Sequence, residues 1–107
     1  METETIKRDI IEIKNLIDQE KYADALLLCN KYPNNIKVIN LKISLYVAQN
    51  KLEKALYLCN KFENEYTIQI RKSSILLKMN EYDKLISFCD KYKENKILNL
   101  YKAKALI

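Results

Sequence analysis

The sequence predicts an all-α chain built from a repeated pair of helices, and three observations carry that prediction. Cys29, Cys59 and Cys89 are spaced 30 residues apart, and the residues around each cysteine repeat as well. Apolar residues recur at steps of three and four, which is the spacing of one helix face. The chain has no glycine and one proline, whereas tight β-hairpins rely on Gly, Asn and Pro. A fixed period of this length is typical of solenoids, in which each unit stacks on its neighbours.

The internal repeat covers nearly the whole chain. The residues around the cysteines read LCNKY at 28–32, LCNKF at 58–62 and FCDKY at 88–92. Upstream segments match in the same register, namely KYADAL at 21–26, KLEKAL at 51–56 and EYDKLI at 81–86. We therefore expect one domain over residues 1–107, with repeats at about 7–36, 37–66 and 67–96 and a terminal helix at 97–107.

Each repeat predicts two helices separated by a short polar break. In the second repeat, Val38, Leu41 and Leu45 lie at helical steps, and a second apolar stripe includes Leu52 and Cys59. The same pattern along the chain predicts helices near 5–18, 21–32, 36–48, 51–62, 67–78, 81–92 and 96–107.

The first repeat resembles a known family. Tyr22 and Ala25, followed by Pro-Asn-Asn at 33–35, resemble the second half of a tetratricopeptide repeat, in which an aromatic and a small residue open the second helix. The usual period of that family is 34 residues, and here the second helix is shorter by about one turn. The resemblance implies a right-handed α-solenoid of antiparallel helical hairpins, with three 30-residue repeats plus one extra helix. Sel1-like and pentatricopeptide repeats are related alternatives.

The second helix of each repeat carries the predicted core. Small residues at Ala25 and Ala55 would let the two helices of a hairpin approach closely. We expect the side chains that form this core to be largely buried, namely Ala25, Ala55, Leu26, Leu56, Ile86, Leu28, Leu58, Phe88, Cys29, Cys59 and Cys89. One cysteine per repeat suits neither a disulfide, which needs Cα atoms about 4.4–6.8 Å apart, nor a zinc site, which needs converging ligands. The cysteines are therefore interpreted as small core residues.

The charge of the chain is uneven. Residues 1–35 carry five basic and seven acidic side chains, and residues 36–107 carry 14 basic and seven acidic ones. A basic half can suit nucleic acid, an anionic membrane or an acidic protein. However, 17 of the 19 basic residues are lysine, whereas nucleic-acid surfaces prefer arginine. A solvated surface that reflects composition is the favoured interpretation, and nucleic acid is disfavoured as a partner.

Neither a membrane span nor a catalytic centre is predicted. No segment approaches the roughly 20 apolar residues of a membrane span, and the acidic N-terminus does not resemble a signal peptide, so we expect a cytoplasmic protein. The absence of glycine excludes a Gly-rich phosphate loop, and the absence of histidine removes the commonest general base and metal ligand. We expect a scaffold that binds protein, not an enzyme, with no cofactor and no metal site.

The resemblance also implies where a partner binds. In tetratricopeptide proteins the first helices line a concave face that holds a polypeptide segment. The partner-binding positions that match are Lys7, Lys14, Lys37, Asn40, Ser44, Ser74 and Lys104. Such a face suits a segment with acidic groups and a few apolar anchors. The alternative is an RNA-binding helical repeat that uses the basic C-terminal two thirds of the chain, which the low arginine content disfavours.

The terminal helix at 97–107 is apolar on more than one side. Its apolar residues include Leu100, Tyr101, Ala103, Leu106 and Ile107. Exposed apolar patches often mark an interface. We expect these residues to contact a second copy of the chain in a homodimer, or the next repeat if the chain is a fragment of a longer repeat protein. An imperfect cap is the third interpretation.

Overall fold

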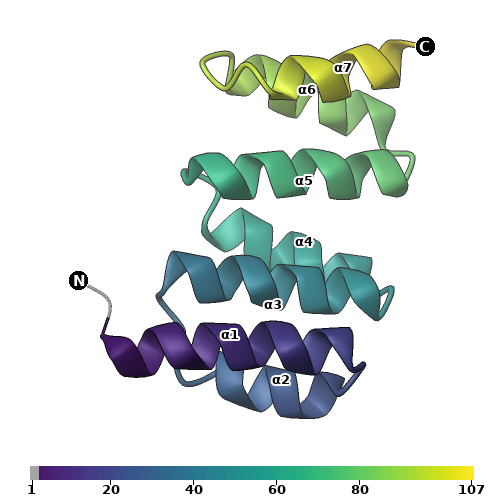
Figure 1. Ribbon diagram of the computed structural model, residues 1–107. Helices are drawn as coiled ribbons and strands as arrows, with labels where there is room; N and C mark the ends of the chain where they lie inside the picture. The colour runs from purple at the N-terminus through teal and green to yellow at the C-terminus, as the bar shows by residue number, and fades with distance from the viewer. Residues whose placement is uncertain (1–2) are drawn as a thin grey trace. The chain divides into compact units, whose positions relative to one another are not determined.

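The computed structural model describes residues 3–107, and that range is entirely helical apart from its turns (Figure 1). Within it, the helices are α1 (Glu4–Asp18), α2 (Tyr22–Cys29), α3 (Ile36–Ala48), α4 (Leu52–Lys61), α5 (Tyr66–Lys78), α6 (Tyr82–Lys91) and α7 (Leu98–Leu106). The all-α prediction is confirmed, and each helix starts or ends within three residues of its predicted bounds. The early end of α2 has a local cause, because the Lys31 and Tyr32 amides bond to carbonyls only three residues earlier.

The described helices form two compact units, and the boundary between them lies between Lys51 and Leu52. The N-terminal unit contains α1, α2 and α3, and the C-terminal unit contains α4 to α7. The boundary between them lies between the two helices of the second predicted repeat, 37–66.

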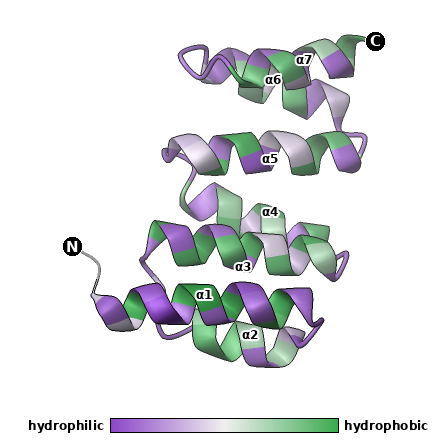
Figure 2. Ribbon diagram, viewed as in Figure 1, coloured by the Kyte–Doolittle hydropathy of each residue, from purple (hydrophilic) through white to green (hydrophobic). Residues whose placement is uncertain are grey.

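The three helices of the N-terminal unit all pack on one another. Helix α1 packs on both α2 and α3, and α2 packs on α3. Apolar and polar residues alternate along α1 (Figure 2), and the core of the unit contains Ile10, Ile13, Cys29 and Val38. The two helices that begin a repeat in this unit, α1 and α3, each have a side-chain N-cap. Thr3 Oγ1 accepts from the Ile6 amide at 3.3 Å, and the Asn35 side chain caps α3.

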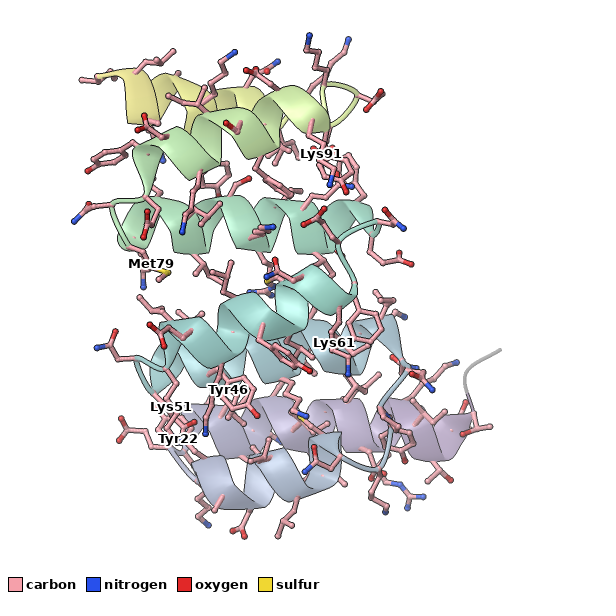
Figure 3. All side chains as sticks on the ribbon, turned by 180° about the vertical axis from the view of Figure 1, so that it is seen from behind. Tyr22, Tyr46, Lys51, Lys61, Met79 and Lys91 are labelled. Carbon is pink, nitrogen blue, oxygen red and sulfur yellow. The ribbon has the colours of Figure 1, made fainter. Side chains whose placement is uncertain are left out.

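The C-terminal unit is organised around α5, on which α4, α6 and α7 all pack. Figure 3 shows Lys61 and Lys91, which end α4 and α6, at one end of this unit and Met79 at the other, so α4 and α6 run in the same direction. Lysines in the last turn of each helix complement the helix dipole.

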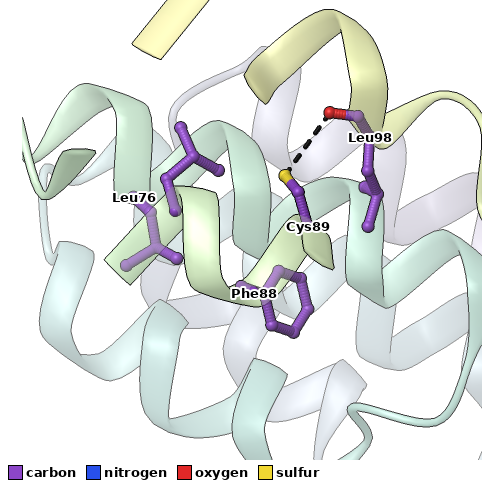
Figure 4. Close-up of a cluster of buried hydrophobic side chains, with 5 residues drawn as sticks. Leu76, Phe88, Cys89 and Leu98 are labelled. Carbon is purple, nitrogen blue, oxygen red and sulfur yellow. Dashed lines mark hydrogen bonds between the residues drawn. The ribbon is translucent and has the colours of Figure 1, made fainter. Parts of the chain in front are cut away.

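The core of the C-terminal unit lies between α5, α6 and α7. Its buried members are Leu76, Leu85, Phe88, Cys89 and Leu98. The Cys89 thiol donates to the Leu98 carbonyl oxygen at 3.4 Å (Figure 4), which ties α6 to the start of α7.

The 30-residue period recurs in the backbone as well as in the sequence. Glu20, Asn50 and Asn80 each follow a first helix, and their φ angles are 60°, 57° and 59°. At each turn the amide of this residue donates to the carbonyl three residues earlier, and the next amide donates to the carbonyl five residues earlier, with all six distances between 2.8 and 3.1 Å. These two bonds define a Schellman motif, which ends a helix with one left-handed residue. The polar breaks predicted at these positions are therefore helix C-caps.

The prediction that these second-helix residues are largely buried is confirmed. Ala25, Ala55, Phe88 and all three cysteines are fully buried. The other five side chains are mostly covered but keep part of their surface exposed, namely Leu26, Leu28, Leu56, Leu58 and Ile86. The buried positions of these helices lie four residues apart, at 25/29, 55/59 and 85/89, so the fully buried stripe is narrow. A residue next to that stripe lies about 100° around the helix and is only partly covered.

The terminal helix begins later than the predicted residue 96. The amides of residues 98, 99 and 100 bond to carbonyls three residues earlier, so the chain first makes a tighter turn. Asn95 stands where Asn35 caps α3, but its side chain is buried against the start of α5 instead. Its Nδ2 donates to the Tyr66 carbonyl at 3.2 Å and to Gln69 Oε1 at 2.9 Å.

Candidate functional site

A cavity of about 460 Å³, broadly open to solvent, lies in the C-terminal unit between α4 and α6, over α5. We name this open cavity the α4–α6 cavity. Two residues of α4, two of α5 and four of α6 line it, namely Leu56, Asn60, Lys72, Leu76, Asp83, Lys84, Ser87 and Phe88. Within each helix these residues are four apart, as in Leu56/Asn60 and Lys72/Leu76, so each helix turns one face to the cavity.

The floor of the α4–α6 cavity is apolar and belongs to the core. Leu76 and Phe88 are 2% and 6% exposed and are part of the buried cluster of the unit. Leu56 is half-buried and packs against the same cluster. A ligand on this floor would therefore contact side chains that tertiary packing already holds in place.

Lys72 forms one wall and is held by two contacts. Its Nζ lies 2.6 Å from Glu63 Oε1 and 4.5 Å from the centre of the Phe88 ring. A cation over an aromatic face is attracted by the ring quadrupole. The charge of Lys72 is thus matched inside the protein, and its side chain is only 15% exposed.

Glu63 holds Lys72 in this position. Besides Lys72, it accepts from Lys91 Nζ at 2.9 Å and from the Tyr92 hydroxyl at 2.7 Å. Burial alone would raise the pKa of Glu63, but the hydrogen bonds from Lys72, Tyr92 and Lys91 outweigh it and lower that pKa from 4.5 to about 2. Glu63 therefore stays ionised at neutral pH and fixes α5 against the end of α6.

The rim of the α4–α6 cavity is polar and exposed. Asn60 lies on the α4 side, and Asp83, Lys84 and Ser87 lie on the α6 side. The Lys84 side chain is 72% exposed, and its Nζ lies 3.9 Å from Glu81 Oε1. An ion pair this long and this exposed contributes little to stability. Asp83 and Lys84 have opposite charges, so this rim is close to neutral.

The seven predicted partner-binding residues are distributed over both units. Lys7 and Lys14 lie on α1, and the three from the second repeat lie on α3, a helix that packs on α1; Ser74 and Lys104 lie on α5 and α7. The four lysines are exposed, whereas Asn40, Ser44 and Ser74 are half-buried. None of the seven lines the α4–α6 cavity. The first-helix binding face stays a prediction.

Several of those residues have local contacts, such as the 3.8 Å approach of Lys7 Nζ to Glu4 Oε1. Asn40 Nδ2 donates to the Ile36 carbonyl at 3.1 Å within α3. Lys104 Nζ lies 5.5 Å from the centre of the Tyr101 ring. These contacts position the side chains along their own helices.

The apolar residues of the terminal helix differ in exposure. Leu100, Ala103, Leu106 and Ile107 are exposed, as the predicted contact surface requires. Tyr101 is half-buried and packs against the core of the C-terminal unit. The contact with a second copy or a following repeat stays a prediction.

A repeated lysine that the sequence reasoning missed explains why the rim is available. Lys42 Nζ donates to Asn30 Oδ1 at 3.0 Å, and Lys102 Nζ donates to Asp90 Oδ1 at 2.6 Å, 60 residues further on. The third lysine of this series, Lys72, turns to Glu63 instead. The amide of Asn60 consequently remains exposed on the rim. The 30-residue spacing of these lysines was the signal that could have revealed the pattern.

The three cysteines are free and buried. Burial raises the pKa of the Cys29 and Cys59 thiols to about 11, and burial also raises the pKa of the Cys89 thiol. A thiol with a raised pKa is a poor nucleophile at neutral pH. Their position and protonation agree with the interpretation as core residues.

Residues 3–107 contain neither a metal-binding cluster nor a membrane-spanning helix. No group of three or more Cys, Asp or Glu side chains in that range could hold a metal ion. In the same range, no helix has the length and apolarity that crossing a membrane requires.

No family model, curated protein or solved structure matches the chain. The tetratricopeptide-like resemblance therefore stays a prediction that rests on the residues quoted for it. Function has to be inferred from the chain's own surfaces, of which the α4–α6 cavity combines an apolar floor with a polar rim.

Proposed function

We propose that this chain is a protein-interaction module that binds a segment of a partner polypeptide and performs no catalysis. The α4–α6 cavity is the observation that carries the proposal. Binding sites are typically concave, several hundred Å³ in volume, and lined by apolar side chains with a few polar groups that orient the ligand. The α4–α6 cavity has that volume and that division between floor and rim.

Preorganisation supports binding at this place. Leu76 and Phe88 are core residues, and Glu63 holds Lys72 at 2.6 Å. Side chains that are already ordered lose little conformational entropy when a ligand arrives. The cavity can therefore bind a partner without a costly rearrangement of its floor or wall.

The charge of the α4–α6 cavity favours a polypeptide over RNA. Lys72 is matched by Glu63, and Asp83 brings a carboxylate to the rim. Nucleic-acid sites instead gather unmatched cations that neutralise phosphates. The predicted binding positions on α1 and α3, which include the exposed Lys7, Lys14 and Lys37, are the alternative place for a partner, and they would suit an acidic segment.

The test selects ligands from a displayed library of random peptides and measures the affinity of the selected peptides for the full chain. Ser87→Tyr places a bulky ring on the rim, and Asn99→Tyr places the same ring on an exposed position of α7 that does not line the cavity. We expect Ser87→Tyr to weaken binding at least tenfold while its melting temperature stays unchanged. Asn99→Tyr should bind as the wild type does.

Two results would reject the proposal. One is a selection that yields no peptide with measurable affinity. The other is equal binding by the wild type, Ser87→Tyr and Asn99→Tyr, which would place the peptides away from the α4–α6 cavity.

A further inference from the structure

The floor of the α4–α6 cavity determines which side chain can enter it. Leu56, Leu76 and Phe88 come from three different helices and offer only carbon atoms. A cationic side chain would approach the ammonium group of Lys72, which already lies over Phe88. An anionic side chain would compete with Glu63, which holds that same ammonium group at 2.6 Å. The floor therefore suits an uncharged apolar side chain.

The rim determines what must accompany that side chain. The Asn60 amide and the Ser87 hydroxyl can each both donate and accept, Asp83 only accepts, and Lys84 only donates. A peptide backbone carries one donor and one acceptor per residue, which matches such a mixed rim. A phosphate or a free carboxylate offers acceptors alone and would meet the like charge of Asp83.

The backbone conformation of the ligand follows from the same inventory. A bound helix has its amides and carbonyls paired within itself, so it would leave Asn60 and Ser87 without main-chain partners. An extended segment leaves those groups free to bond to a receptor. Asn60 is available for this role because Lys72 is bonded to Glu63, whereas the equivalent Asn30 is bonded to Lys42.

We infer that the α4–α6 cavity takes an extended polypeptide segment that places one uncharged apolar side chain on Leu56, Leu76 and Phe88. The backbone beside that side chain bonds to Asn60 on the α4 side and to Ser87 on the α6 side. This inference rests on the proposed function, and it adds the conformation of the partner and the chemistry of its anchor.

The test uses peptides selected from the random library and the full chain. Synthetic versions of one selected peptide are methylated at each backbone nitrogen in turn, which removes a donor without changing a side chain. We expect methylation next to the apolar anchor to weaken binding tenfold or more, and methylation at the peptide ends to have little effect. Replacing the anchor with Asp or Lys should abolish binding.

Matched protein variants locate the bonds. We expect Asn60→Ala and Ser87→Ala each to weaken binding several-fold, because each removes a rim group that bonds to the backbone. Asn30→Ala is the control, since Asn30 occupies the equivalent position and is bonded to Lys42. It should leave the affinity unchanged. A steep loss of affinity with added salt would contradict a neutral ligand.

The outcomes separate the inference from the proposed function. If Ser87→Tyr blocks binding but methylation has no effect, or the bound peptide is helical by circular dichroism, the cavity binds polypeptide and the extended segment is wrong. If the selection yields no binding peptide, the proposed function fails and the inference fails with it.

Discussion

The two units use the same repeat but stabilise it differently. Ile13, Ile39 and Ile43 of the N-terminal unit are buried. The positions 30 residues after Ile39 and Ile43 are Gln69 and Ser73 in the C-terminal unit, and these polar side chains are buried as well. A core that replaces aliphatic side chains with polar ones has to satisfy each of them. The residues that repeat every 30 positions therefore specify where the helices lie. The residues that depart from the repeat specify which side chains connect the helices within a unit.

The buried polar side chains of the C-terminal unit form one connected set. Gln69 Nε2 donates to the Glu63 carbonyl at 3.1 Å, and Gln69 Oε1 accepts from Asn95. The Ser73 hydroxyl donates to the Gln69 carbonyl at 3.1 Å. These bonds connect the loop before α5, helix α5 itself and the loop before α7. The same region holds Glu63 and hence the wall of the α4–α6 cavity.

The largest expected effect comes from exchanging core residues between the units. The first hairpin combines a large Ile13 with a small Ala25, and the third combines a small Ser73 with a large Leu85, all four fully buried. Leu85→Ala should lower the free energy of unfolding by about 2–5 kcal/mol. Ser73→Ile should lower it by about 1–3 kcal/mol through overpacking.

The double variant Ser73→Ile/Leu85→Ala carries the residue pair of the first hairpin, so it should lose less stability than Leu85→Ala alone. Urea unfolding of the three variants checks this expectation. Additive losses would show that the two positions do not share a packing site.

The second prediction concerns acid stability. The pKa of Glu63 is lowered to about 2 in the folded protein, below its usual 4.5, so its stabilising effect is present above the unfolded pKa. That effect should disappear as the pH falls from about 5 to about 2, and it amounts to at most about 3 kcal/mol. Glu63→Gln should be less stable at pH 7 and should depend less on pH over this range.

Urea unfolding at several pH values measures the difference. Asp90→Asn is the matched control, because Asp90 also bonds to a lysine but its side chain is 47% exposed. We expect a much smaller change for it. Parallel pH profiles for the wild type and Glu63→Gln would contradict the role given to Glu63.

The third prediction compares two asparagines at equivalent positions. Asn95→Ala removes the donor that satisfies the Tyr66 carbonyl and Gln69 Oε1 in a buried setting, and should cost about 1–3 kcal/mol. Asn35→Ala removes an N-cap and should cost about 1 kcal/mol. Thermal or urea unfolding ranks the two. A larger loss for Asn35→Ala would contradict the weight given to the buried polar set.

The smallest expected effect is a gain in stability. Glu20, Asn50 and Asn80 share the left-handed conformation, in which Asn is tolerated better than Glu. Glu20→Asn should therefore raise the free energy of unfolding by about 0.5–1 kcal/mol. The reverse change, Asn50→Glu, should lower it by a similar amount. Equal free energies of unfolding for the wild type, Glu20→Asn and Asn50→Glu would show that Glu20 does not strain this turn.

Much of the fold could be predicted because the period repeats simple physical requirements. The cysteine stripe predicted the buried face of the second helices, and the polar breaks predicted the turns. The pattern predicted that Leu26 and Leu56 are largely buried, which they are, but it did not distinguish them from the fully buried Ala25 and Ala55. Helix pattern gives the direction of a side chain but not the area that neighbouring helices cover.

The candidate site could not be predicted for a related reason. Glu63 stands where the other repeats have Pro33 and Lys93, so nothing repeated marks it. Its effect depends on Lys72 and Lys91, which lie 9 and 28 residues away and come together only in the folded unit. The predicted binding residues lie on first helices, whereas the α4–α6 cavity is lined mainly by second helices.

The most direct measurement is a nuclear magnetic resonance titration of the full chain with a peptide selected from the random library. We expect chemical-shift changes at the amides of Leu56, Asn60 and Ser87, and little change on α1 and α3. Changes concentrated on Lys14, Asn40 and Ser44 would instead place the partner on the first helices of the N-terminal unit. That result would contradict the assignment of binding to the α4–α6 cavity.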